Sequence, residues 1–417
     1  MAHLQTQKTL GATLTAVVLL AFPLFGQKNT CIECHQQLED SLKAPVAGMA
    51  QDIHQKFGLS CRDCHGGNPT QDDVDLAKDR TFKGAPKKAR IPEFCGACHS
   101  DAAFMHKYNP NIRIDQLELY RTSQHGRLLA KGDAKVAVCT DCHGVHGILP
   151  ATMPKSPIFP WNVPQTCGRC HADAKYMQPY GIATNQVEEY KASVHAKALY
   201  DKKDLSAPVC NNCHGNHGAL PPSVSAIAFV CRQCHASTGE LFSQSPHKAA
   251  LDKMGLGECE ACHGHHKILQ PTDELIGTGK TAVCIQCHDS GTKAFEIAAR
   301  VKGLLDAYLQ SLDSAESKLE LADRRGVEVS EPKFKLKEAR SALTEMRNLT
   351  HGLSLDVLTK KSTEGEKILS EVFKEGDDAL LEAKTRRTGL IVATAFLGLL
   401  ALALFLKIKQ INAKKRA

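Results

Sequence analysis

The sequence predicts a mainly α-helical protein with long irregular loops, and three observations lead to this fold class. Nine Cys-x-x-Cys pairs, each followed directly by His, are spread over residues 31–288. Apolar residues then recur at three- and four-residue spacing over residues 297–381, as on one face of a helix. An uncharged run from Thr388 to Leu406 follows. Only 5% of the residues are aromatic, so few large side chains are available for a conventional core.

The cysteine pattern indicates the chemistry. All 18 cysteines belong to these motifs, so none is left for a disulfide. Zinc ribbons and thioredoxin-like pairs do not require His after the second Cys. Covalent haem attachment does, because two thiols one turn apart form thioethers with the vinyl groups and the next imidazole binds the iron. The sequence therefore predicts nine covalently bound c-type haems.

The attachment residues and the first iron ligands follow directly from the motifs. The attachment cysteines are Cys31, Cys34, Cys61, Cys64, Cys95, Cys98, Cys139, Cys142, Cys167, Cys170, Cys210, Cys213, Cys231, Cys234, Cys259, Cys262, Cys284 and Cys287. The first ligands are His35, His65, His99, His143, His171, His214, His235, His263 and His288. With only about 30 residues per haem, the porphyrins must form the core, so short helices at the motifs and long irregular connections are expected.

Internal repeats supply candidates for the second iron ligand. The segment Gln116–His125 recurs at Gln186–His195, and a third copy ends at His247. Each copy precedes Cys-x-x-Cys-His-Gly-x-His and then a plain motif, so one unit holds two haems and two extra histidines. The first unit is degenerate, with His54 present but Asn68 in place of the second extra histidine.

The repeats divide the extra histidines into two groups. Those that the repeats support as second ligands are His54, His125, His146, His195, His217, His247 and His266. His106 and His265 complete a set of nine, but His106 aligns with Gln178 in the next copy and His265 is adjacent to His266. His351 lies outside the repeats and is interpreted as an ordinary exposed histidine on a helix. We assign no catalytic residue.

The two ends of the chain indicate export and anchorage. Residues 1–26 have one Lys and an apolar run, which predicts a secretory signal peptide, with an uncleaved anchor as the alternative. Export suits haem attachment, which takes place outside the cytoplasmic membrane in known systems. The run from Thr388 to Leu406 predicts a transmembrane helix rather than a buried core helix, because it has no polar face and basic clusters flank it. The more basic tail predicts a cytoplasmic C-terminus.

The stretch between the motifs and the apolar run has no cysteine and predicts an antiparallel stalk of two or three helices, with a turn over residues 324–332. A self-packed spacer and a docking or oligomerising element are both compatible with it. The predicted organisation is a signal peptide (1–26), a nonahaem cytochrome domain (27–290), a helical stalk (291–387), a transmembrane helix (388–406) and a basic cytoplasmic tail (407–417).

Over residues 31–288 the chain resembles multihaem c-type cytochromes of the bis-histidine electron-transfer kind found in anaerobic respiration. The resemblance implies a periplasmic haem domain on the cytoplasmic membrane. It would carry electrons from a membrane quinol-oxidising donor to periplasmic, outer-membrane cytochrome or extracellular acceptors. Related tetrahaem quinol dehydrogenases have an N-terminal anchor, so the C-terminal anchor here argues against direct quinol oxidation.

Two other function classes are weighed against this one. A multihaem reductase of a small nitrogen or sulfur oxyanion, or of hydroxylamine, would need one haem with an open iron position. Nucleic-acid binding is disfavoured although the formal charge is +7. Each of nine haems brings two propionates and, when its iron is ferric, about one positive charge, so the oxidised holoprotein has a net charge of about −2.

Overall fold

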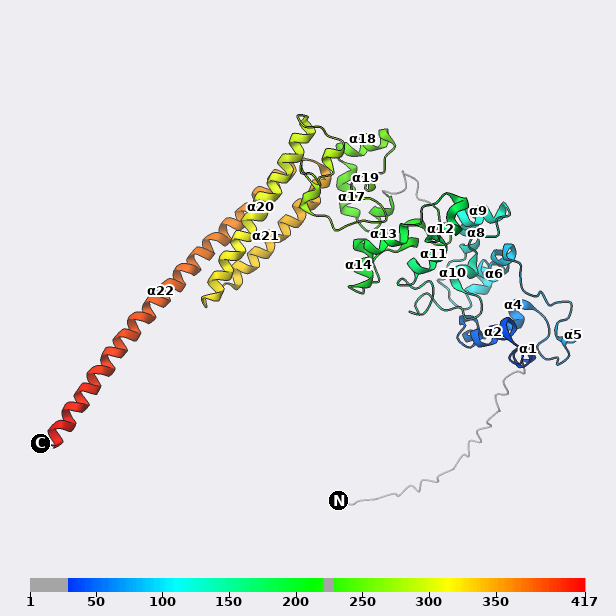
Figure 1. Ribbon diagram of the computed structural model, residues 1–417, viewed down its shortest axis with the longest axis horizontal. Helices are drawn as coiled ribbons and strands as arrows, with labels where there is room; N and C mark the ends of the chain where they lie inside the picture. Colours follow the sequence, from blue (N-terminus) through cyan, green and yellow to red (C-terminus); the bar gives the residue numbers. More distant parts are fainter. Residues whose placement is uncertain (1–28, 221–228, 417) are drawn as a thin grey trace, which may run out of the picture. The chain divides into compact units, whose positions relative to one another are not determined.

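The computed structural model describes residues 29–220 and 229–416, and within these ranges every regular element is a helix (Figure 1). The predicted signal peptide lies outside the described residues. Contacts divide the chain into two compact units, one formed by Met1–Glu118 with His125–Phe159 and the other by Leu119–Gln124 with Pro160–Ala417. The mainly α-helical prediction is confirmed.

Short helices joined by irregular segments make up the motif-bearing region, as the sequence predicts. Up to the third Cys-x-x-Cys-His-Gly motif they are α1 (Thr30–His35), α2 (Asp40–Met49), α3 (Ile53–Lys56), α4 (Cys61–His65), α5 (Val74–Ala77), η1 (Lys88–Arg90), α6 (Ile91–His99), α7 (Ala102–Met105), α8 (Gln116–Thr122), α9 (Gln124–Ala130), α10 (Cys139–His143), α11 (Val163–His171), α12 (Ala174–Met177), η2 (Gln178–Tyr180), α13 (Gln186–Ala192), α14 (Val194–Tyr200) and α15 (Cys210–His214). Then follow α17 (Ala236–Ser243), α18 (Pro246–Met254), α19 (Glu260–His263), η3 (Asp273–Leu275) and η4 (Cys284–Gln286).

Three long helices form the predicted stalk, and they pack against one another along their lengths (Figure 1). These are α20 (Lys293–Arg324), α21 (Ser330–Leu349) and α22 (Leu355–Arg416), with the short turn η5 (Thr350–Gly352) between the last two. Their core consists of side chains from all three helices that are almost fully buried, among them Leu305, Tyr308, Leu312, Leu319, Leu343, Met346, Leu358, Leu369 and Val372. The apolar stripe of the sequence is therefore the seam of a three-helix bundle.

Two boundaries differ from the prediction. Pro332 belongs to the first turn of α21 rather than to the preceding loop, because proline lacks only an N–H that has no partner in a first helical turn. The third stalk helix and the apolar run are one continuous helix of 62 residues, since no proline occurs anywhere in it. The part of α22 ahead of Thr388 is about 50 Å long at 1.5 Å per residue.

The apolar part of α22 fits a single-pass membrane anchor. Among the described residues, it is the one helix that is both long and apolar enough to cross a membrane. None of its apolar window is buried in the protein, which argues against the alternative of a core helix.

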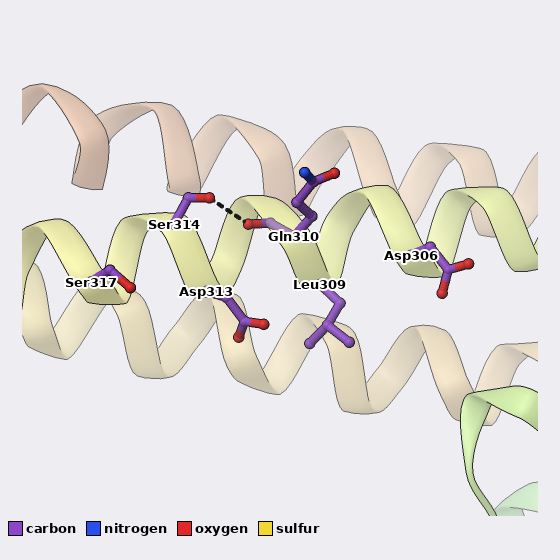
Figure 2. Close-up of a pocket in the computed structure, with 6 residues that line it drawn as sticks. All are labelled: Asp306, Leu309, Gln310, Asp313, Ser314 and Ser317. Carbon is purple, nitrogen blue, oxygen red and sulfur yellow. Dashed lines mark hydrogen bonds between the residues drawn. The ribbon is translucent and has the colours of Figure 1, made fainter.

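The stalk also carries a shallow surface pocket along α20, lined by Asp306, Leu309, Gln310, Asp313, Ser314 and Ser317 (Figure 2). The Ser314 hydroxyl donates to the Gln310 carbonyl oxygen at 2.8 Å, so part of this lining is already paired within the helix. The residues that line the pocket include neither cysteine nor histidine, so they offer no group for haem attachment or iron binding.

Packing at Gly365 gives a test of the bundle. A Cβ at Gly365 would overlap the ring and hydroxyl of Tyr308, whose buried hydroxyl donates to the Ala339 carbonyl oxygen at 2.9 Å. We expect Gly365→Ala to lower the free energy of unfolding of the stalk by about 1–3 kcal/mol. Gly303→Ala is the matched control, because nothing lies within 4 Å of a Cβ there. It should raise stability by about 0.5–1 kcal/mol. Thermal unfolding followed by far-UV circular dichroism in detergent measures both, and equal shifts would contradict this packing.

Candidate functional site

Each Cys-x-x-Cys-His-Gly motif begins a short helix for a local reason. In the motifs at Cys61, Cys139 and Cys210, the backbone N–H of the residue before the first cysteine donates to the side chain two positions after that cysteine, from Ser60 to Asp63 at 2.7 Å, from Val138 to Asp141 at 2.8 Å and from Val209 to Asn212 at 2.8 Å. The helix then ends at the histidine, because the glycine that follows has a positive φ, 82° at Gly144. The two thiols and the imidazole therefore share one helical turn.

Within each of the two compact units, motifs that are consecutive in the sequence also lie next to one another. Burial and the neighbouring Cys98 raise the pKa of Cys64, and a hydrogen bond with Cys139 together with burial raises the pKa of Cys95. Such thiol pairs join each motif to the next, and they are Cys31–Cys61, Cys64–Cys98 and Cys95–Cys139 in the first unit and Cys167–Cys210, Cys213–Cys234, Cys231–Cys259 and Cys262–Cys284 in the second. Groups attached to these thiols would follow one another as closely as the motifs do.

Six pairs of imidazole rings have nearly the same distance between their ring centres. Each pair joins a motif histidine to a histidine distant in sequence, with ring centres 5.8–6.3 Å apart. The pairs are His54–His99, His65–His146, His195–His235, His214–His266, His247–His288 and His263–His351. Two metal–nitrogen bonds of about 2 Å and two ring radii of about 1.1 Å place ring centres about 6 Å apart. The residues therefore fit an iron held between two imidazoles.

Ring orientation also fits metal binding. The Nδ1 atom of His35 lies 2.9 Å from the Leu42 carbonyl oxygen, and that of His65 lies 2.9 Å from the Gly84 carbonyl oxygen. A carbonyl oxygen can only accept, so Nδ1 carries the proton and Nε2 keeps its lone pair for a metal. Burial, followed by the neighbouring histidine, lowers the pKa of His195 and His247 and favours the neutral ring that a metal ligand requires.

A backbone contact recurs in the repeats and positions the extra histidines. The residue before His54, His125 and His195 donates its N–H to the turn that follows another extra histidine. These bonds run from Ile53 to the Ile148 carbonyl oxygen at 2.8 Å, from Gln124 to Ala219 at 3.0 Å and from Val194 to Ile268 at 2.8 Å. The residue one step earlier is buried at every copy, as Asp52, Ser123, Ser193 and Ser245. We call this arrangement the repeat clamp.

In the first copy of the repeat clamp, the buried residue is the carboxylate Asp52, where the other copies have serine. One carboxylate oxygen accepts from the His54 backbone N–H and lies 2.9 Å from His54 Nδ1, and the other accepts from the N–H groups of Gly147 and Ile148 at 2.7 and 2.8 Å. Burial acts to raise the pKa of Asp52, but these hydrogen bonds outweigh it and the pKa is lowered. The sequence analysis missed Asp52, although the match of Asp-x-His to Ser-x-His in the other copies is a signal for it.

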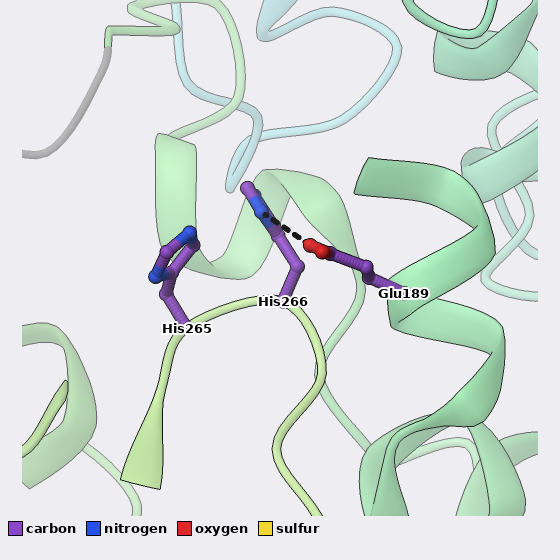
Figure 3. Close-up of side chains that lie close together, drawn as sticks. All are labelled: Glu189, His265 and His266. Atoms are coloured by element: carbon purple, nitrogen blue, oxygen red, sulfur yellow. Dashed lines mark ion pairs between the residues drawn. The ribbon is translucent and has the colours of Figure 1, made fainter. Parts of the chain in front are cut away.

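His106 and His265, the two candidate ligands that the repeats do not support, do not belong to these six pairs. His106 is exposed directly after α7, and no ring contact with a motif histidine is recorded for it in the described ranges. His265 is exposed beside His266, with ring centres 4.8 Å apart, too close for an iron between them (Figure 3). Glu189 completes a small cluster with both, and its carboxylate lies 3.7 Å from His266 Nδ1 (Figure 3). The other five candidates, His35, His125, His143, His171 and His217, are all half-buried.

The interpretation of His351 as an exposed helical histidine is wrong. It lies half-buried in η5, between two helices, with its ring centre 6.1 Å from that of His263. The sequence analysis dismissed it because it falls outside the repeats. The clue in the sequence was the position of His351, because it directly precedes Gly352, which ends a long amphipathic segment.

Residues 53–172 match the model of the cytochrome c3 family. This stretch contains four of the cysteine motifs, those beginning at Cys61, Cys95, Cys139 and Cys167. No curated protein and no solved structure matches the chain. This match supports a cytochrome c3-like domain at residues 53–172, which implies covalently bound c-type haem and iron, and it supports a multihaem electron-transfer cytochrome.

The repeat clamp at Asp52 can be tested by substitution. In Asp52→Asn one oxygen becomes an NH₂ group that faces backbone N–H donors, so we expect a loss of about 2–3 kcal/mol in the free energy of unfolding. Asp141→Asn is the matched control, because Asn212 already fills that position in another copy. It should change stability by less than about 0.5 kcal/mol. Denaturant unfolding measures both, and an unchanged Asp52→Asn protein would show that these hydrogen bonds are not needed.

Proposed function

We propose that the chain is a membrane-anchored nonahaem cytochrome that conducts electrons along haems arranged in chain order. The observation that carries this proposal is the proximity of thiols of consecutive motifs within each compact unit, with thiol–thiol hydrogen bonds at Cys95–Cys139, Cys167–Cys210 and Cys231–Cys259. Haems joined to such neighbouring thiols would have their attached edges close together, which is the arrangement that electron transfer between haems requires. When bound, the haems supply reversible one-electron chemistry at iron.

The imidazole pairs support a carrier rather than an enzyme. Two neutral imidazoles fill both axial positions of an iron, so no substrate can bind to it. The chain's own residues act as positioning groups, since backbone carbonyl oxygens orient the rings and the repeat clamp holds them in place. The ligands that we propose are the nine motif histidines and the seven supported by the repeats, with His106 for the haem at Cys31.

Location follows from the two ends of the chain. We propose a cleaved signal peptide, a haem domain on the periplasmic side and a cytoplasmic C-terminus, in agreement with the basic tail after Leu406. The stalk part of α22 separates the haem region from the apolar segment, so the donor is a separate quinol-oxidising membrane protein. Periplasmic or outer-membrane cytochromes are the acceptors, and the pathway belongs to anaerobic respiration.

One observation favours the reductase alternative. In residues 29–220 and 229–416 no second imidazole is recorded against His35, whose ring is otherwise held by the Leu42 carbonyl oxygen. If His106 does not bind this iron, the haem at Cys31 has an open position where nitrite, hydroxylamine or a sulfur oxyanion could bind.

Carbon monoxide binding separates carrier from reductase. We expect the reduced parent protein to bind less than about one carbon monoxide for every nine haems, because imidazole fills the sixth position. His106→Ala should add about one binding site and convert one haem to high spin. Stoichiometric binding by the parent, together with turnover of nitrite or hydroxylamine with a reduced dye, would establish the reductase instead.

Topology has its own test. Protease added to sealed spheroplasts should release haem-bearing fragments and leave the Thr388–Leu406 segment in the membrane. A haem-stained gel measures the release. Haem that stays in the membrane through an N-terminal fragment would instead mean that the signal sequence is an uncleaved anchor.

A further inference from the structure

We propose that His351, in the turn between the second and third stalk helices, is the second iron ligand of the haem attached at Cys259 and Cys262. This assignment rests on the haem binding proposed above. It extends the cofactor site beyond the motif region into the stalk.

Geometry is the first support. The His263 and His351 rings lie 6.1 Å apart with an angle of 25° between their planes. Both values fall among those of pairs such as His214–His266, at 6.0 Å and 21°, and His65–His146, at 6.0 Å and 32°.

Chain order is the second support. His65 and His214 each belong to a Cys-x-x-Cys-His-Gly motif. His65 pairs with His146 and His214 pairs with His266, and in both cases the partner comes from the following repeat unit. His263 belongs to the last motif of this kind, so no later unit exists to supply its partner. The next histidine beyond the last motif is His351.

The repeat clamp ends at the same point in the chain. The residue before the extra histidine donates a backbone N–H at Ile53, Gln124 and Val194. In the last copy this residue is Pro246, which has no N–H to donate. The last unit therefore lacks the contact that ties earlier units to a following repeat, and the stalk turn takes the place of that repeat.

His265 does not serve as the ligand in place of His351. It is only two residues after His263, a span of at most about 7 Å, too short to pass around a porphyrin to its opposite face. Its neighbour His266 is already paired with His214, and the His265 side chain is exposed (Figure 3). His351 approaches His263 from a different segment, as a second ligand must.

The turn that carries His351 is fixed against the motif region. Arg347 donates two hydrogen bonds to the Asp273 carboxylate at 2.8 and 2.7 Å, and the Thr238 hydroxyl donates to Asn348 Oδ1 at 2.7 Å. His351 Nδ1 lies 2.9 Å from the Asn348 carbonyl oxygen. This is the same orientation as in His35 and His65, and it leaves Nε2 free to bind the iron.

Substitution in the full-length protein tests the assignment. His351→Ala should convert one haem from low to high spin, add about one carbon monoxide site per molecule, and recover low spin when free imidazole is added. His351→Met should keep that haem low-spin through a thioether ligand and shift its potential upward, whereas replacement of a residue that does not bind iron would leave the axial ligands and their spectrum unchanged. Electron paramagnetic resonance and a redox titration measure these changes.

His265→Ala is the matched control and should leave spin state, carbon monoxide binding and potentials unchanged. The assignment is overturned if both His351 variants keep the parent spectrum, or if His265→Ala produces the high-spin haem. Should His351→Ala fail to accumulate, the potential of the His351→Met protein decides. Failure of the proposed function is a separate result, because it would appear in the parent protein as missing or high-spin haems.

Discussion

In the function proposed here, the bond between iron and two imidazoles from distant segments is the constraint on which the rest of this architecture depends. Side chains from the motif region contribute little conventional core, and the well-packed apolar clusters are the stalk and a small group around Val163, Leu199 and Val209. Elsewhere, segments are brought together where two histidines face each other at about 6 Å. Backbone hydrogen bonds alone give too little stabilisation to order such irregular connections against their conformational entropy. The cofactors therefore act as the cross-links of the fold.

The repeat arrangement explains how these cross-links are kept in order. In the pairs His65–His146 and His214–His266, a later repeat unit contributes an imidazole to the one before it. The repeat clamp joins successive repeat units through the backbone, as between Ile53 and Ile148. A repeat unit therefore depends on its neighbours for part of its histidine pairs and backbone contacts, as in other repeat proteins. Terminal units must depart from the pattern, and here Pro246 and the stalk turn mark that departure.

Local patterns in the sequence were sufficient for much of this description. The three- and four-residue spacing of apolar residues predicted the stalk, because a helix buries one face at that period. The motif helices were predictable from covalent chemistry alone. The spatial order of the motifs and the role of Asp52 were not, since both depend on contacts between segments far apart in the chain. The interpretation of His351 was wrong for the same reason. Its partner His263 is 88 positions earlier in the sequence and lies in a motif helix, whereas His351 lies in a turn of the stalk.

The unbroken helix α22 determines how the haem domain meets other molecules. With the apolar end of α22 in a membrane, as proposed, a domain carried on this helix would search for partners in two dimensions rather than three, at one fixed height above the lipid surface. The effective concentration of a partner then depends on whether its own redox centre reaches that height, as with any tethered pair whose linker must match the span. Shortening or lengthening the rod by whole turns would change which partners can exchange electrons, without altering any haem.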